Sequence, residues 1–441
     1  MILKMMDNAS ARPLDIVVFG ATGLSGAYVV AELLERTIQS GAVCAEDADR
    51  RIGIAGRSRD KLTALQTKLG ADDTSCPILV ADVQDAAALA AVARQAKLIV
   101  SCAGPYRHYG EPVVAACIEA GTDYIDISGE PEYIEMIEAK YHEKAKERGV
   151  LVVSACGWDS IPAELGSLRT ARRFKPPAVC TQIEEFVTIH GGAAGIAAHY
   201  ATYCSAVEGI GATGELKKLR ASQPKKPRPA IPGPPLKRQI SPYWEKRLDA
   251  YAVPFMGADA SIVRRAVQTF ADHPRGLSDK GTQGIPPFHF AAYLTIPDRW
   301  SLWRYVALGT AFVQLAAREW GRRLLLEYPR FFTWGLFTKA APTEEQTKET
   351  SFEMTFYGAG YDAPPPPGSN QPPNKCVGVR ICGPDPADNS TSIIASQAAL
   401  CLISARPRLA KGGVHTAGSV FGFTDLEERL GKAGVVFEDI S

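Results

Sequence analysis

The sequence lacks a net charge, a long hydrophobic run and paired cysteines. Its 441 residues hold 49 Lys and Arg against 48 Asp and Glu, a formal net charge of +1. No overall field exists to hold a nucleic-acid backbone, so we expect no nucleic-acid partner. No apolar run reaches the roughly 18 residues that a membrane-spanning helix needs. The ten Cys include no C-x-x-C pair, which indicates reduced thiols rather than a disulfide framework.

Signals of secretion and of metal binding are also missing. Residues 1–13 are mixed polar and carry no apolar core of a signal peptide, so we expect a cytoplasmic protein. The seven His residues include no H-x-x-x-H or H-x-H pair, and we expect no metal site. With 46% hydrophobic and 22% charged residues, the chain has the composition of a folded protein of about two domains.

Short apolar runs alternate with amphipathic stretches in the first third of the chain. Strands are predicted at 15–19, 51–55, 77–80, 97–102, 123–127 and 150–154, and helices at 60–69, 85–95 and 131–148. This alternation predicts a parallel sheet with helices on both faces. The fold class is therefore α/β, with a Rossmann-type doubly wound parallel sheet.

Beyond Cys156 the regular alternation of short apolar runs and amphipathic stretches ends. The predicted strands 180–190, 287–296, 351–357 and 375–382 are separated by helical stretches and by two proline-rich linkers, 221–242 and 362–374. This pattern predicts a second, α+β domain with an antiparallel or mixed sheet. Residues 391–405 and 418–440 are again helical in pattern, with a short strand at 435–437. We expect a dinucleotide-binding domain at 1–160, a domain for substrate binding or dimerisation at 161–390, and a C-terminal segment, 391–441, that returns to the first domain.

A glycine-rich loop, G-A-T-G-L-S-G at 20–26, follows the first predicted strand and precedes an apolar helix. Gly20 permits the sharp turn, Gly23 lets the backbone approach a pyrophosphate, and Gly26 lets the helix pack on the strand. Five further strands in βαβ order make this a dinucleotide-binding loop. The residues expected to bind the dinucleotide are Gly20, Thr22, Gly23, Leu24, Ser25 and Gly26 here, and Ala103 and Gly104 after the fourth strand.

The end of the second predicted strand bears on the choice of coenzyme. Proteins that select NAD place a carboxylate there, on the ribose 2′-hydroxyl. This chain has Arg57 and Ser58 instead, and an arginine fork suits a 2′-phosphate. We therefore expect NADP(H) rather than NAD(H). Asp82, after the third strand, either lies beside the adenine or caps the helix that begins near Asp85.

Three segments that follow predicted strands carry polar residues where the nicotinamide should lie: C-A-G-P-Y-R-H-Y-G-E-P (102–112), D-I-S-G-E-P (126–131) and C-G-W-D-S-I-P (156–162). Together with the glycine-rich loop, Y-A-V-P-F-M-G-A-D at 251–259 and G-G-V-x-T at 412–416, they resemble the saccharopine dehydrogenase-like oxidoreductase family, which includes trans-acting enoyl reductases. The resemblance covers nearly the whole chain, although Trp158 and Ala417 stand where family members usually have Phe and often Pro. It implies a Rossmann domain with an inserted α+β domain, an NAD(P)-dependent reductase and, for animal members, association with lipid droplets or membranes.

Tyr106, Glu130 and Asp159 are the candidate proton sources. No Tyr between 106 and 141 has Lys four positions on, so the chemistry of short-chain dehydrogenases is excluded. Reduction of C=C or C=N needs only a positioned hydride and one proton donor. Each candidate has a structural alternative, in which Tyr106 bonds its own loop, Glu130 caps the helix at 131, and Asp159 caps the helix at 161.

His190 and His199 flank a glycine-rich turn and either face the substrate cleft or serve the structure. Their position after a predicted strand is the reason to consider a cleft. The structural role is the more frequent one for an isolated His.

A tryptophan-rich stretch occupies residues 300–334. It holds four of the six Trp, interleaved with five Arg around an apolar core at 305–317. Trp and Arg beside an amphipathic helix are typical of a helix that lies in a membrane interface. The alternative is a core helix beneath which the proline-rich linkers run. The basic segment 217–238 either adheres to an anionic surface or is a solvated linker.

Two functions remain. The first is an NADPH-dependent reductase that acts on C=C or C=N of a hydrophobic, lipid-like or natural-product substrate. A saccharopine-type dicarboxylate is less suited, because 186–200 and 352–361 contain no Arg to bind it. The alternative is a protein of a lipid surface, a peripheral membrane or lipid droplet, that binds a dinucleotide without turnover. The sequence leaves monomer and homodimer open.

Overall fold

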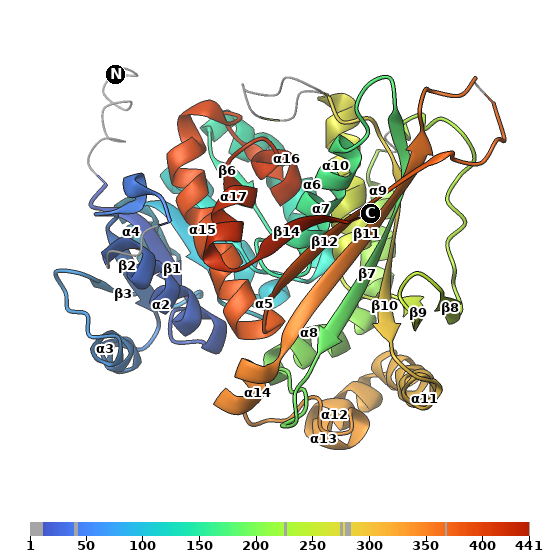
Figure 1. Cartoon of the computed structure of the whole chain (residues 1–441). Helices are drawn as coiled ribbons and strands as arrows, with labels where there is room; N and C mark the ends of the chain where they lie inside the picture. Colours follow the sequence, from blue (N-terminus) through green and yellow to red (C-terminus); the bar gives the residue numbers. More distant parts are fainter. Residues whose placement is uncertain are drawn as a thin grey trace.

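In the computed structural model the chain folds around two seven-stranded sheets (Figure 1). The structure describes residues 12–38, 43–224, 227–273, 277, 284–366 and 368–440. The first sheet is parallel throughout, in the order β13-β6-β5-β4-β1-β2-β3. Its strands are β1 (Leu14–Phe19), β2 (Ile52–Gly56), β3 (Ile78–Val80), β4 (Ala96–Ser101), β5 (Asp123–Asp126), β6 (Leu151–Val153) and β13 (Gly413–His415).

Helices cover both faces of this sheet. Along β1, Ile16 and Val18 face one layer of buried side chains and Val17 and Phe19 face the other, as the alternation of a strand requires. The first layer is completed by α2 (Leu24–Ile38) and α3 (Arg59–Lys68), and the second by α4 (Ala86–Gln95), α5 (Tyr106–Ala120) and α6 (Pro131–Arg148). The predicted doubly wound sheet is confirmed, and the predicted strands and helices of this region begin and end within one residue of those observed.

The second sheet is mixed, in the order β14-β12-β11-β7-β10-β9-β8. Only β7 and β10 run parallel, and the other neighbours are antiparallel. Its strands are β7 (Val179–His190), β8 (Tyr243–Glu245), β9 (Ala250–Pro254), β10 (His289–Ile296), β11 (Ser351–Tyr361), β12 (Lys375–Pro384) and β14 (Val436–Ile440). The sequence does not predict β8 and β9, because strands of three and five residues leave little periodicity.

One continuous core joins the two sheets. Helix α7 (Ser160–Arg172) is buried on nearly all sides and packs on β7, β11 and β12. Helix α15 (Thr391–Ala405) is also buried nearly all round and packs on α2 and β4. The cluster of buried side chains runs from Ile16 in β1 through Leu165 in α7 to Phe356 in β11. The same layer contains α10 (Asp259–Asp272), α16 (Ala417–Phe421) and α17 (Leu426–Ala433).

The end of the chain contributes to both sheets. β13 lies beside β6 in the first sheet. The strand predicted at 435–437 is β14, which pairs with β12 in the second sheet. Short helical turns are η2 (Ala45–Asp47), η3 (Pro386–Ser390) and η4 (Arg406–Arg408).

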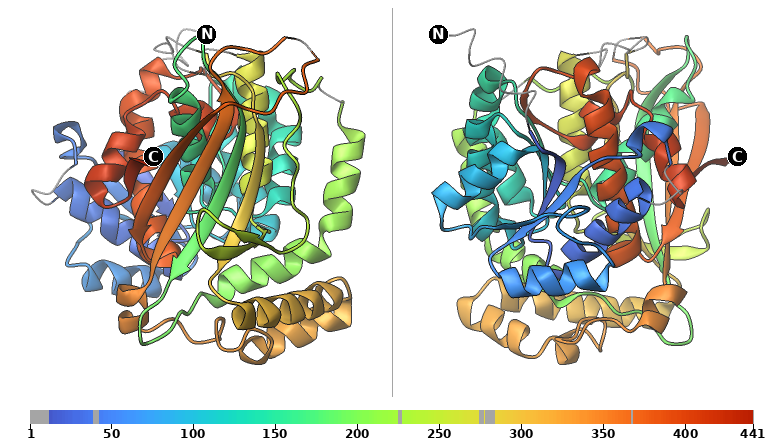
Figure 2. Two further views of the ribbon diagram at one scale, coloured as in Figure 1. Left: turned by 45° about the vertical axis from the view of Figure 1, so that its right-hand side comes forward. Right: turned by 90° about the vertical axis from the view of Figure 1, so that its left-hand side faces the viewer.

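The remaining helices gather mainly at one end of the molecule, at the bottom of Figure 1 and of both views in Figure 2. They are α8 (Tyr200–Gly211), α11 (Arg299–Ala316), α12 (Glu319–Glu327), α13 (Pro329–Phe332) and α14 (Glu344–Glu349), while α9 (Thr213–Ser222) runs up one side. Of the helices that the structure describes, none combines the length and the apolar character needed to cross a membrane.

Candidate functional site

The loop between β1 and α2 presents unpaired backbone N–H groups. Gly20 turns the chain with φ +78°, a left-handed conformation that favours glycine. The N–H groups of Thr22, Leu24, Ser25 and Gly26 have no acceptor among the described residues. A Cβ on Gly26 would collide with the Gly20 carbonyl oxygen. Four free N–H groups at a helix N-terminus form a site for an anion.

The loop after β4 lies directly against the glycine-rich loop. A Cβ on Gly20 would stand 2.9 Å from the backbone N of Ala103. Gly23 donates its N–H to the Gly20 carbonyl (2.9 Å), and a Cβ on Gly23 would lie 3.2 Å from that carbonyl oxygen. Gly104 has only the Tyr106 ring near it. The residues predicted to bind the dinucleotide at these two loops are therefore neighbours in space.

The end of β2 offers an unpaired cation. Arg57 is exposed, and its guanidinium has no ion pair or hydrogen bond within the described part of the chain. Ser58 caps α3 by accepting the Lys61 N–H (3.4 Å). Asp82 does not cap α4. Asp85 caps α4, because the cap of a helix must lie directly before its first residue. The Asp82 carboxylate accepts the Gln84 N–H (3.0 Å) instead.

These features fit a bound NADP(H). The free N–H groups of the glycine-rich loop would hold the pyrophosphate, and Arg57 would hold the 2′-phosphate. When bound, NADPH supplies a hydride at the nicotinamide. The chain's own residues must orient the substrate and supply a proton.

Tyr106 bonds the end of β4, and Glu130 joins the loop after β5 to the start of α5. The Tyr106 hydroxyl donates to the Ser101 carbonyl (2.8 Å), and burial raises the pKa of Tyr106 well above its usual value. Glu130 accepts the N–H groups of Tyr106 (3.0 Å) and Arg107 (3.1 Å). It therefore caps α5 rather than the helix at 131, since the loop after β5 lies over the start of α5. The Ser205 hydroxyl of α8 donates to the same carboxylate (3.2 Å).

Asp159 lies at the end of a strained loop after β6. Its φ of +87° is unusual for a residue with a side chain. Its carboxylate accepts the Ala258 N–H (3.2 Å) from the segment before α10, and no hydrogen bond caps α7. Asp159 therefore ties the loop after β6 to α10, which differs from the capping alternative.

Three carboxyl groups meet at this point. Asp259, at the start of α10, interacts electrostatically with Asp159 and with Glu185 of β7. Among the described residues no N–H or O–H donor reaches either oxygen of Glu185 or Asp259. Burial, together with the charge of Asp159, raises the pKa of both well above the usual values. Glu185 and Asp259 therefore favour the protonated form, because burial and a neighbouring carboxylate both disfavour the charge.

Sequence reasoning misses Glu185 and Asp259, although a signal exists for each. Glu185 stands between Ile183 and Val187 on the buried face of β7, and a Glu in an apolar register is informative. Asp259 closes the segment 251–259, which the resemblance includes.

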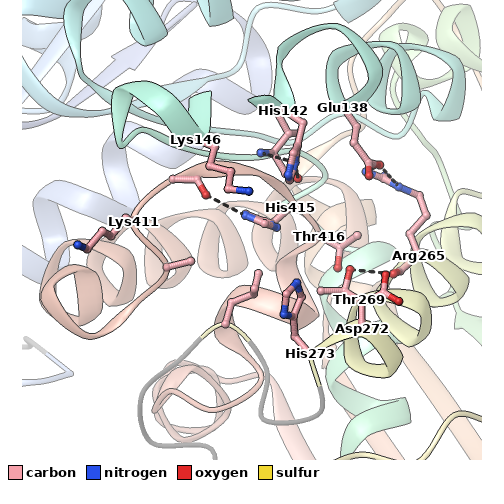
Figure 3. A pocket seen from close by; sticks show the side chains of 14 residues that line it. Glu138, His142, Lys146, Arg265, Thr269, Asp272, His273, Lys411, His415 and Thr416 are labelled. Carbon is pink, nitrogen blue, oxygen red and sulfur yellow. Dashed lines mark hydrogen bonds and ion pairs between the residues drawn. The ribbon is translucent and has the colours of Figure 1, made fainter. Parts of the chain in front are cut away.

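A separate pocket of about 300 Å³ lies at the edge of the first sheet, between α6, α10 and residues 410–416 (Figure 3). The His415 and His142 rings meet edge to face, 5.2 Å apart, and burial lowers the pKa of His415 to about 4. Arg265 forms an ion pair with Glu138 on the wall. In the part of the chain that the structure describes, no three His, Cys, Asp or Glu side chains are placed to hold a metal ion. No residue of the glycine-rich loop lines this pocket.

The tryptophans of α11 to α13 form an exposed aromatic surface. Trp300, Trp303, Trp320 and Trp334 are 61–69% exposed, and Phe331 is 75% exposed. The first two rings stack at 5.6 Å, and Arg304 lies 4.2 Å from the Trp334 ring. The alternative of a core helix is therefore wrong. The proline-rich linker packs on the second sheet instead, where the Pro234 carbonyl accepts from Gln182 (2.9 Å).

Comparison with known proteins agrees with this arrangement. Residues 16–153 match the family model of the saccharopine dehydrogenase NADP binding domain. The protein is thus an NADP-dependent oxidoreductase with a Rossmann domain. The chain is 39% identical over 442 residues to the saccharopine dehydrogenase-like oxidoreductase of Mus musculus, covering 98% of both proteins. It is 34% identical over 435 residues to the lipid droplet localized protein of Caenorhabditis elegans, covering 96% of this chain and 97% of the relative.

The chain belongs to the saccharopine dehydrogenase-like oxidoreductase family. Its fold is similar to that of the solved saccharopine dehydrogenase (L-Glu forming) of Saccharomyces cerevisiae, with a TM-score of 0.55 at 11% identity over 97% of this chain and 100% of that one. The family resemblance and the choice of NADP made from the sequence are both confirmed.

Proposed function

We propose that the protein is an NADPH-dependent reductase of C=C or C=N bonds in hydrophobic, lipid-like substrates, and that it works at a lipid surface. The observation that carries the proposal is the position of α8. This helix connects the loops at the nicotinamide end with the aromatic surface.

On one side, α8 contacts the loops that follow β4 and β5. Ser205 donates to Glu130, and the Glu208 carbonyl accepts from Arg107 (3.1 Å). On the other side, the Tyr203 ring packs on Phe312 of α11 at 5.6 Å, and the hydroxyl donates to the Leu325 carbonyl of α12 (3.3 Å). A substrate dissolved in lipid therefore meets the protein one helix away from the coenzyme.

The exposed aromatic surface supports contact with lipid. Indole rings favour the headgroup boundary, and arginines favour anionic lipid. An exposed cluster of this kind in a monomer marks an interaction surface. The name of the Caenorhabditis elegans relative, a lipid droplet localized protein, agrees with this reading.

The test is the oxidation of NADPH, followed by its absorbance, with a panel of enones, imines and ketones carried in anionic vesicles. We expect turnover of enones or imines with long apolar chains, and faster turnover with vesicles than without them. Binding of vesicles and NADPH without turnover of any panel member would favour the alternative, a lipid-surface protein that binds the dinucleotide without chemistry. Turnover of ketones alone would refute the assigned bond type.

A further inference from the structure

His199 and Asp388 form a buried pair that the fold and the coenzyme loops do not account for. The His199 Nε2 lies 2.5 Å from the Asp388 Oδ1, and both side chains are almost wholly buried. The other ring nitrogen, Nδ1, has no hydrogen-bond partner in the described ranges and is not among the fully enclosed polar atoms. A carboxylate on one nitrogen of a histidine orients the ring and leaves the other nitrogen to act.

The pair lies at the carboxyl edge of the first sheet. His199 directly precedes α8, whose Ser205 reaches Glu130 in the loop after β5. Asp388 belongs to η3, which packs on α2, the helix that begins in the glycine-rich loop. The methyl group of Thr391, which follows η3, would lie 3.4 Å from a Cβ on Gly157 in the loop after β6. The elements that carry the pair, α8 and η3, thus contact the loop after β5 and α2 at the edge of the sheet where a doubly wound fold places the nicotinamide.

We propose that His199 donates the proton of the reduction and that Asp388 positions it, an inference that rests on the proposed reductase function. When bound, NADPH would supply a hydride to one atom of the C=C or C=N bond. The Nδ1 proton of the imidazolium goes to the other atom, so the double bond becomes a single bond with two new hydrogens. NADP⁺ and neutral imidazole remain, and the imidazole recovers its proton from water.

The other polar groups near the site have different tasks. Tyr106 donates to the backbone, and Glu130 accepts three hydrogen bonds. Asp159 accepts from Ala258 and contacts Asp259. None of them presents a free proton as the Nδ1 of a protonated His199 does.

Asp388 and Asp385 act directly on His199, and Tyr28 and Glu344 lie on neighbouring elements around the same acids. Asp385 and Asp388 lie in η3, Tyr28 lies in α2, and Glu344 lies in α14. Burial and the charges of these acids raise the pKa of Tyr28, so the phenol stays neutral.

The test measures the dissociation constants of NADP⁺ and NADPH by fluorescence from pH 5.5 to 8.5. A protonated His199 beside the nicotinamide repels the positive charge of NADP⁺, so the ratio of the NADP⁺ to the NADPH dissociation constant should rise at least about threefold at low pH. The rise should be absent in His199→Gln and unchanged in the control His190→Gln, which removes an exposed His at the end of β7. The pH dependence of this ratio should also differ from that of the wild type in Asp388→Asn, which keeps the imidazole and carries the test if His199→Gln does not fold.

The outcomes separate this inference from the proposed function. An unchanged pH dependence in His199→Gln would overturn the assignment, and loss of that dependence in Asp159→Asn alone would give the role to the carboxyl. If the ratio of the dissociation constants rises at low pH as expected but no panel substrate is turned over, the reductase function is contradicted. The position of His199 beside the nicotinamide is then still supported. With a turned-over substrate, His199→Gln should lower kcat about 100-fold with little change in KM.

Discussion

Replacing Glu164 with Gln should change how the stability of this protein depends on pH. Glu164 lies on α7, where one carboxyl oxygen accepts the Gly418 N–H (2.8 Å) and the other has no donor among the residues described. Burial raises the pKa of Glu164 to about 7, whereas a Glu in an unfolded chain has a pKa of about 4.3. The carboxyl therefore takes up a proton on folding at any pH between these values.

The sign of the effect follows from this proton. Because the native state binds it more tightly than the unfolded state does, the free energy of unfolding falls as the pH rises from about 4.3 to about 7. One pKa unit corresponds to about 1.4 kcal/mol, so the loss between pH 5 and pH 8 is about 2.5 kcal/mol. A Gln keeps an acceptor for Gly418 and has no proton to lose. The stability of Glu164→Gln relative to the wild type should therefore increase by about 2.5 kcal/mol over this range.

Urea unfolding at pH 5, 6, 7 and 8 measures this difference. The control is Glu143→Gln, which makes the same chemical change at an exposed site on α6. The gap in unfolding free energy between Glu164→Gln and the wild type should widen with pH, and the gap for the control should stay constant. A constant gap for Glu164→Gln would mean that the carboxyl is ionised in the folded protein, and the reasoning from burial would be wrong.

Three further substitutions test the coenzyme loops and the aromatic surface. Arg57→Ala should weaken NADPH binding by about 1.5–3 kcal/mol and NADH binding much less, and equal losses in calorimetric titrations would show that Arg57 does not read the 2′-phosphate. Gly23→Val should abolish binding of both coenzymes while the circular dichroism spectrum stays native, because its side chain would fill the space of the pyrophosphate. The double variant Trp303→Ser, Trp320→Ser should sediment less with anionic vesicles and should keep the unfolding midpoint of the wild type. Trp244→Ser on β8 is the control. A large drop in the midpoint of the double variant would contradict the exposure of Trp303 and Trp320.

The first domain is predictable from the sequence because its signals are local. A buried parallel strand is a short apolar run, and a glycine-rich loop directly after it needs no distant partner to be interpreted. Prediction is weaker for a residue whose hydrogen-bond partner lies in a distant segment of the chain. From its position before residue 131, Glu130 is expected to cap the helix that follows it, yet its side chain caps α5.

The candidate site is harder to predict because its parts come from distant segments. Asp159, Glu185 and Asp259 meet only after β7 and α10 have packed on α7. Asp388 carries no signal of its own, since its partner His199 lies in another part of the chain. The exposure of Trp303 is likewise undecided until the fold shows that α8 and α12 pack on α11 and leave Trp303 exposed, because the composition of α11 suits both a core helix and a surface helix.

The single core that α7 and α15 share with both sheets limits how ligands enter and leave. Closure by hinge rotation needs two bodies with separate cores and few contacts between them. Rotating the second sheet away from the first would here expose the buried sides of both helices to water. We therefore expect coenzyme exchange and substrate entry to involve the helices at the lower end in Figure 1, where α8 is held to the first domain by polar contacts such as Ser205 with Glu130. Since the aromatic surface belongs to the same group of helices, contact with lipid and opening of the site would involve the same movement.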